Sequence, residues 1–106
     1  MAEFKKECLQ KVERIAYQLE GMNIEELYEY FEDYLDVKYV INDSGEYWGA
    51  YIYIELGGPN VWVDTIDHSV KLAWGGEKVE WGLSRKTVEK IDEIFEECCN
   101  SCIKKA

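Results

Sequence analysis

Six carboxylates crowd into the twelve residues from position 25 to position 36. On a helix, four of these positions fall at i, i+4, i+7 or i+8, and i+11, which aligns one carboxylate per turn. Successive carboxylates then lie roughly 6 Å apart along the axis, near the spacing of phosphates along one nucleic-acid strand. This spacing favours a surface that imitates a phosphate backbone and binds the basic channel of a nucleic-acid-binding protein. The six are Glu25, Glu26, Glu29, Glu32, Asp33 and Asp36.

The alternative is an ordinary solvated helix face. Like charges at i,i+4 destabilise a helix by about 0.2–0.5 kcal/mol per pair, and a solvated face usually mixes signs to avoid this cost. A second, partial acidic row follows near the C-terminus, where Lys86 and Lys90 dilute it. It comprises Glu89, Asp92, Glu93, Glu96 and Glu97.

The net charge belongs to the middle of the chain. Residues 22–67 contain eleven acids and one base, Lys38, which accounts for the whole net charge of −10. The segments on either side each contain as many bases as acids. Such a middle segment repels nucleic acid and anionic membrane surfaces and attracts cations or basic protein surfaces. Generic solubility is the competing explanation.

An aromatic strand supplies a second candidate surface. In residues 47–56 the alternation places Ala50, Ile52 and Ile54 on one face and tyrosines on the other. Aromatic residues are enriched at protein interfaces, so this face favours a dimer or a bound partner; ordinary cross-strand aromatic pairing is the alternative. The surrounding acids argue against base stacking. The expected outward residues are Tyr47, Tyr51 and Tyr53, joined by Trp62 and Asp64 on the next strand.

Cysteine is the third candidate chemistry. Cys8, Cys98, Cys99 and Cys102 are the right number for a tetrahedral zinc site. The last three lie within a helical pattern, however, whereas a CxxC knuckle normally sits on a turn. The cysteines can instead act as small apolar side chains in the core. We therefore expect buried thiols, and neither a metal nor another cofactor.

Catalytic patterns are weak. His68 is the only histidine and lies in an expected turn with Asp67, so the sequence does not favour a Ser-His-Asp or Cys-His arrangement. The loop Gly57-Gly58-Pro59-Asn60 lacks the phosphate-binding GxxxxGK[ST] pattern, and it is interpreted as a connection between strands, with a small-ligand loop as the alternative. The chain is expected to be no enzyme.

The elements that position these residues follow from hydrophobic periodicity and turn residues. The first helix should end before Gly21, the second should begin after an Asn23 cap, and the last should begin after a Ser84 cap. Leu35 and Cys98 are expected to point inward. The expected helices are 3–20, 24–35 and 85–103, and the expected strands are 37–41, 47–56, 61–65, 70–74 and 78–81.

This order, ααβββββα, predicts an α+β fold. Consecutive strands joined by short turns favour an antiparallel meander of four to five strands, with the helices on one face. The length of 106 residues allows a single domain, 1–106. No run of eighteen apolar residues and no apolar signal region occur, so we expect a cytoplasmic protein without a membrane segment.

In physical type, the chain resembles the small acidic anti-CRISPR and anti-restriction proteins of phages and mobile elements. The resemblance rests on its size, on the uncompensated acids of Glu25 to Asp36 and on the aromatic sheet. It implies stoichiometric inhibition of a defence nuclease, by covering its DNA- or RNA-binding site in the host cytoplasm. The lysines of residues 68–106 restrict such mimicry to one side.

The sequence thus favours a non-enzymatic acidic protein that binds a basic, nucleic-acid-binding protein and does not bind nucleic acid itself. A homo-oligomeric or small-ligand-binding module that uses the Tyr/Trp face is the alternative. The two differ in their response to salt, because electrostatic docking weakens as ionic strength rises and an aromatic interface survives it.

Overall fold

The chain folds as three helices and a five-stranded sheet, in a computed structural model that describes the backbone of residues 2–105 and the side chains of residues 3–101. The helices are α1 (Ala2–Glu20), α2 (Ile24–Tyr30), the 3-10 turn η1 (Phe31–Asp33) and α3 (Arg85–Lys105). The strands are β1 (Asp36–Ile41), β2 (Tyr47–Glu55), β3 (Asn60–Asp64), β4 (Ser69–Trp74) and β5 (Glu77–Gly82). The predicted α+β order is confirmed.

Local signals set the helix ends as expected. The first helix ends at Glu20, before Gly21. Asn23 caps α2, and Glu26 closes a capping box by accepting the Asn23 backbone N–H. The Ser84 hydroxyl accepts the backbone N–H of Thr87 at 3.2 Å, which satisfies one donor in the first turn of α3.

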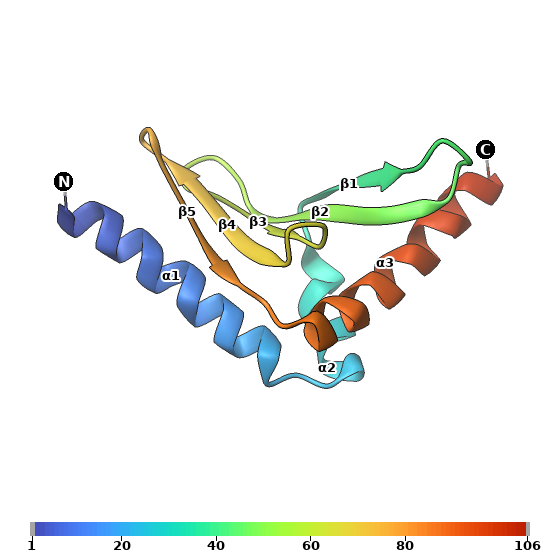
Figure 1. Cartoon of the computed structure of the whole chain (residues 1–106), viewed down its shortest axis with the longest axis horizontal. Coiled ribbons are helices and arrows are strands. Elements are labelled where there is room, and N and C mark those ends of the chain that lie inside the picture. Colours follow the sequence, from blue (N-terminus) through green and yellow to red (C-terminus); the bar gives the residue numbers. More distant parts are fainter. Residues whose placement is uncertain (1, 106) are drawn as a thin grey trace.

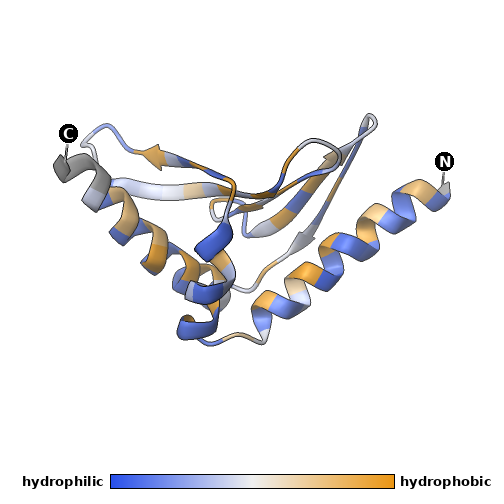
Figure 2. Ribbon diagram, turned by 180° about the vertical axis from the view of Figure 1, so that it is seen from behind, coloured by the Kyte–Doolittle hydropathy of each residue, from blue (hydrophilic) through white to orange (hydrophobic). Residues whose placement is uncertain are grey.

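The sheet is an antiparallel meander in the order β1-β2-β3-β4-β5. All three helices lie on one side of it (Figure 1), with α1 against β4 and β5, α3 against β2, and α2 against α3. Blue and orange alternate around both long helices in Figure 2, as expected for amphipathic helices that bury one face. The buried layer between helices and sheet includes Leu19, Ile52, Val63, Leu72 and Phe95. The opposite face of the sheet, here called the outer face, is covered by none of the helices within residues 2–105.

The two long helices form a V, and a polar junction fixes its apex (Figure 1). The carboxylate of Glu20, at the end of α1, accepts the Ser84 backbone N–H at 2.5 Å and the hydroxyls of Ser84 and Thr87 at 2.7 Å each. Burial alone would raise the pKa of Glu20, but these hydrogen bonds outweigh it and hold the pKa below its usual value. The end of α1 thus supplies an anion where the dipole of α3 favours one.

The second helix is shorter than expected. It stops at Tyr30 and tightens into η1, whereas the sequence predicted a helix to Leu35. The turn puts Phe31 into the core, edge-on to Phe95 with ring centroids 5.5 Å apart. The Leu35 backbone N–H then bonds to the Tyr53 carbonyl at 2.8 Å, so Leu35 already follows the sheet. Its side chain is 57% exposed, and the prediction that it points inward is wrong.

Two further predictions about facing are wrong. A β-bulge between Val40 and Ile41 pairs Ile41 with Tyr47, and it places Tyr47 on the face that the helices cover. Trp48 is 67% exposed in consequence. On α3, Cys99 is buried in place of Cys98, which is half-buried.

None of the described helices combines the length and the apolar composition needed to cross a membrane.

Candidate functional site

The acids of α2 and η1 lie at the surface. Glu25, Glu29, Glu32 and Asp33 are all exposed, and α2 with η1 is predominantly blue in Figure 2. Within the described side chains, none of these four carboxylates forms an ion pair with a lysine or arginine. Glu26 is also exposed, but its carboxylate serves the capping box. These negative charges are therefore solvated and uncompensated.

A contact between helices extends this surface. The hydroxyl of Tyr28 on α2 donates a hydrogen bond of 3.3 Å to the carboxylate of Glu97 on α3. The charge of Glu97 is the main cause that raises the pKa of Tyr28, and Glu93 adds to it. The acids of α3 thus come beside those of α2. We call the combined set the acidic surface: Glu25, Glu29, Glu32, Asp33, Glu93 and Glu97.

The acidic surface is broader and less regular than the predicted row. Of the acids in that row, only Glu25 and Glu29 lie on α2, since the helix ends at Tyr30. Asp36 opens β1 opposite Tyr53, and it accepts the backbone N–H of Val37 at 2.9 Å. The even spacing of one carboxylate per turn up to Asp36 is therefore absent, and the acids of the acidic surface come from α2, η1 and α3.

Other acids of the middle segment have local partners. Glu55 pairs with Lys11 of α1 at 2.9 Å. Asp64 and Asp67 both pair with Lys71, at 3.1 and 2.5 Å. Part of the excess charge of residues 22–67 is consequently held in structural ion pairs and does not belong to the acidic surface.

The outer face of the sheet carries the predicted aromatic residues except Tyr47. Tyr53 and Trp62 are directly opposite each other on β2 and β3, and their rings stack with centroids 5.6 Å apart and an interplanar angle of 27°. The Lys38 ammonium lies 5.6 Å from the centre of the Tyr53 ring, within cation–π range. Tyr51 lies opposite Asp64 in the same register. All three aromatic side chains are half-buried.

The Asp64 side chain lies on the outer face, but it accepts hydrogen bonds from the turn that follows β3. It is 5% exposed, and its carboxylate accepts the backbone N–H groups of Ile66 and Asp67 at 2.9 Å each. Lys71 contacts Asp64, Asp67 and, at 3.8 Å, Glu80. The hydrogen bond to Asp67 is the main cause that raises the pKa of Lys71, so the ammonium stays charged. Asp64 is therefore a poor candidate for partner binding.

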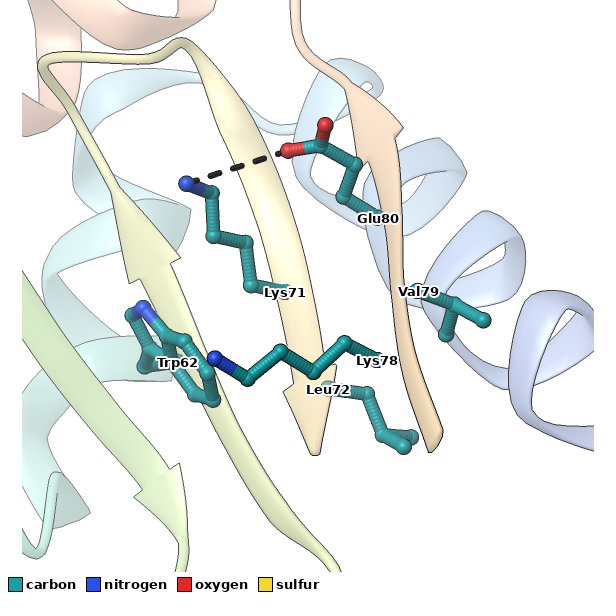
Figure 3. Close-up of a pocket in the computed structure, with 6 residues that line it drawn as sticks. All are labelled: Trp62, Lys71, Leu72, Lys78, Val79 and Glu80. Atoms are coloured by element: carbon teal, nitrogen blue, oxygen red, sulfur yellow. Dashed lines mark ion pairs between the residues drawn. The ribbon is translucent and has the colours of Figure 1, made fainter. Parts of the chain in front are cut away.

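A hollow of about 290 Å³ opens on the outer face beside Trp62. Figure 3 shows its lining side chains, with Trp62 on β3, Lys71 on β4, and Lys78 and Glu80 on β5; Lys78 extends across β4 in the direction of Trp62. The hollow thus combines an aromatic wall with charges of both signs.

A polar cluster that the sequence did not reveal lies on the opposite, helix-covered side. The Tyr47 hydroxyl donates a hydrogen bond of 2.5 Å to Asp92 of α3. Burial raises the pKa of Asp92, and hydrogen bonds from Tyr47 and Thr65 together with the nearby His68 only partly oppose this. Burial likewise raises the pKa of Tyr47. No single segment contains these residues, so periodicity could not have found the cluster.

The thiols give no support to a zinc site. Cys8 and Cys99 are buried, and burial raises the pKa of Cys8, which disfavours the thiolate that zinc needs. Among the described residues, no group of three or more histidine, cysteine, aspartate or glutamate side chains is arranged to hold a metal ion. Cys102 lies outside the described side chains.

Comparison of this chain with protein-family models, with curated proteins and with solved structures finds no match.

Proposed function

We propose that this protein is a non-enzymatic inhibitor that binds a nucleic-acid-binding protein, such as a defence nuclease, by presenting the acidic surface in place of a phosphate backbone. The observation that carries the proposal is the Tyr28–Glu97 contact, which joins uncompensated carboxylates from two helices into one surface. No base in the described part of the chain neutralises the acids of α2 and η1.

The electrostatics support a charged partner of opposite sign. Like charges held together repel one another and lower the stability of the free protein. A basic surface relieves that repulsion when it binds, and it also accelerates association at low salt. A nucleic-acid channel has both the positive charge and the concave shape that a protruding acidic surface would fill.

The experiment is capture of proteins from a bacterial lysate on the immobilised chain. Bound proteins are challenged with a short DNA duplex, and in parallel with a rise in ionic strength from about 50 mM to about 500 mM. The proposal expects nucleic-acid-binding proteins that duplex DNA displaces and that salt releases. Proteins that remain bound in the presence of excess duplex would contradict mimicry.

Two variants of equal charge make the test specific. Glu29→Lys, Glu32→Lys and Asp33→Lys together change the acidic surface, and Glu3→Lys, Glu7→Lys and Asp43→Lys change exposed acids elsewhere. Each triple variant moves the net charge from −10 to −4. The proposal expects the first to lose capture and the second to retain it. Equal capture by both variants would show that net charge, and not the acidic surface, determines binding.

The stacked pair Tyr53–Trp62 favours a second candidate function, because it lies on a sheet face that no helix covers. This face would serve as an interaction or ligand-binding surface, with or without self-association. An aromatic interface depends little on salt. Sedimentation of the wild-type chain and of Trp62→Leu at low and high salt tests self-association: a dimer that survives salt and that the substitution abolishes would support it.

A further inference from the structure

The hollow beside Trp62 has a fixed aromatic wall. Tyr53 stacks on the Trp62 indole from the β2 side, and Lys38 in turn lies over the Tyr53 ring. The hollow extends from Trp62 toward β4 and β5. An indole that is held in this way can stack with a flat ring without first losing its own side-chain freedom.

The two lysines that line the hollow differ in their partners. Lys71 is held by Asp64 and Asp67, so its charge is already compensated. Lys78 is exposed and forms no ion pair within the described side chains, although the chain has twenty-two acids. The hollow therefore presents an uncompensated positive charge that extends across β4 toward the indole (Figure 3), and Glu80 supplies an acceptor at its β5 side, near Lys71.

We propose that this hollow binds a small ligand that consists of one flat aromatic ring system with an anionic group. The ring stacks on Trp62, and the anion pairs with the Lys78 ammonium. An N–H group on the ligand can donate to Glu80. This inference concerns the outer face only, and it does not depend on the acidic surface.

Size and charge define this ligand class. A volume of about 290 Å³ is at the lower limit of ligand pockets, which begin at about 300 Å³, so it suits one ring system and not an oligonucleotide. The net charge of −10 also repels polyanions much more than it repels a ligand with one anionic group. A mononucleotide and a small aromatic carboxylate share the required chemistry.

The experiment is a titration followed by the indole N–H signal of Trp62 and the backbone N–H signal of Lys78 in NMR spectra of the full chain. The probes are adenosine monophosphate and indole-3-acetate, each compared with a neutral partner, adenosine or indole-3-ethanol. Inorganic phosphate tests the anion without a ring. We expect saturable shifts with Kd between about 10 μM and about 1 mM for at least one anionic probe, and about tenfold weaker binding of its neutral partner. The responding probe identifies the source of the ligand.

Surface variants complete the test. Lys78→Gln should weaken the anionic probe about tenfold and leave the neutral one unchanged, whereas Lys86→Gln, an exposed lysine on α3, should change neither. Trp62→Leu should abolish binding of both, with the fold checked by the remaining spectrum. The proposal is overturned if neither anionic probe gives saturable shifts, if charged and neutral probes bind equally, or if Lys78→Gln binds as the wild type does. Such a result leaves DNA-displaceable capture by the acidic surface unaffected.

Discussion

Tyr47 of β2 and Asp92 of α3 are joined by a hydrogen bond of 2.5 Å, although they are 45 positions apart in the chain. The bond exists because the bulge between Val40 and Ile41 turns Tyr47 toward the helices. It connects the sheet to the helix that supplies the acids Glu93 and Glu97. The residue first expected to contact a partner therefore belongs to the scaffold.

Tyr47→Phe should destabilise the protein by about 1 kcal/mol, because the half-buried Asp92 carboxylate loses a donor. Burial raises the folded-state pKa of Asp92. The free-energy cost of burying its charged carboxylate is therefore present above that pKa and disappears as the pH falls through it. The deficit of the variant should therefore be larger near pH 7 than near pH 4. Urea unfolding at both pH values measures it. Tyr17→Phe, at a 67% exposed site, is the control and should unfold as the wild type does.

Glu20→Gln tests the apex of the V. The folded-state pKa of Glu20 is lowered, so its stabilisation is complete above the usual value of 4.5 and is lost as the pH falls through the folded-state pKa. We expect a deficit of about 1 kcal/mol at neutral pH, typical of a lost helix N-terminal anion, that shrinks in acid. Unfolding curves across this pH range test it, with Glu3→Gln as the control. A deficit that does not change with pH would contradict the assignment.

Gly49→Ala should destabilise the fold by about 1–3 kcal/mol through overpacking. An added Cβ would lie 2.5 Å from Ile66 Cγ1 and 3.0 Å from Thr65 Oγ1, on the turn after β3. Gly21→Ala is the matched control, because its Cβ would meet nothing closer than 3.7 Å. Thermal unfolding of both variants gives the comparison. A Gly49→Ala protein as stable as Gly21→Ala would mean that the turn can move away at no cost.

The sequence predicted the order and approximate bounds of every strand, because alternation and turn residues such as Gly75-Gly76 are local signals. It also predicted the caps at Asn23 and Ser84 for the same reason. The end of α2 was not predictable, because it depends on Phe31 reaching Phe95 across the core. The facing of Tyr47 depends on a bulge whose register is set by the hairpin between β1 and β2.

Part of the candidate site was likewise predictable from the sequence, and part of it depends on tertiary packing. The exposure of Glu25, Glu29, Glu32 and Asp33 follows from composition, since uncompensated carboxylates remain in water. Their junction with Glu97 depends on tertiary packing of α2 against α3, which no local pattern contains. The alternation placed Tyr53 and Trp62 on the same face of two neighbouring strands, and this predicted that the two side chains lie close together.

Charge reversal at Glu29, Glu32 and Asp33 should not lower the stability of the fold. Lysines at positions 29, 32 and 33 remove like-charge repulsion, and Glu25 with a lysine at position 29 forms a favourable i,i+4 pair. The triple variant should therefore unfold at the same temperature as the wild type or slightly above it. Loss of capture together with a lower unfolding temperature would instead indicate damage to the fold.

The most direct test of mimicry is displacement of a labelled DNA duplex from a purified, captured partner, followed by fluorescence anisotropy. The account predicts stoichiometric displacement by the wild type and by the control with Glu3, Glu7 and Asp43 changed to lysine. It predicts displacement at least about 100-fold weaker, or about 2.7 kcal/mol, for the variant with Glu29, Glu32 and Asp33 changed to lysine. A complex in which the protein and the duplex bind the partner together, or equal displacement by both variants, would contradict it.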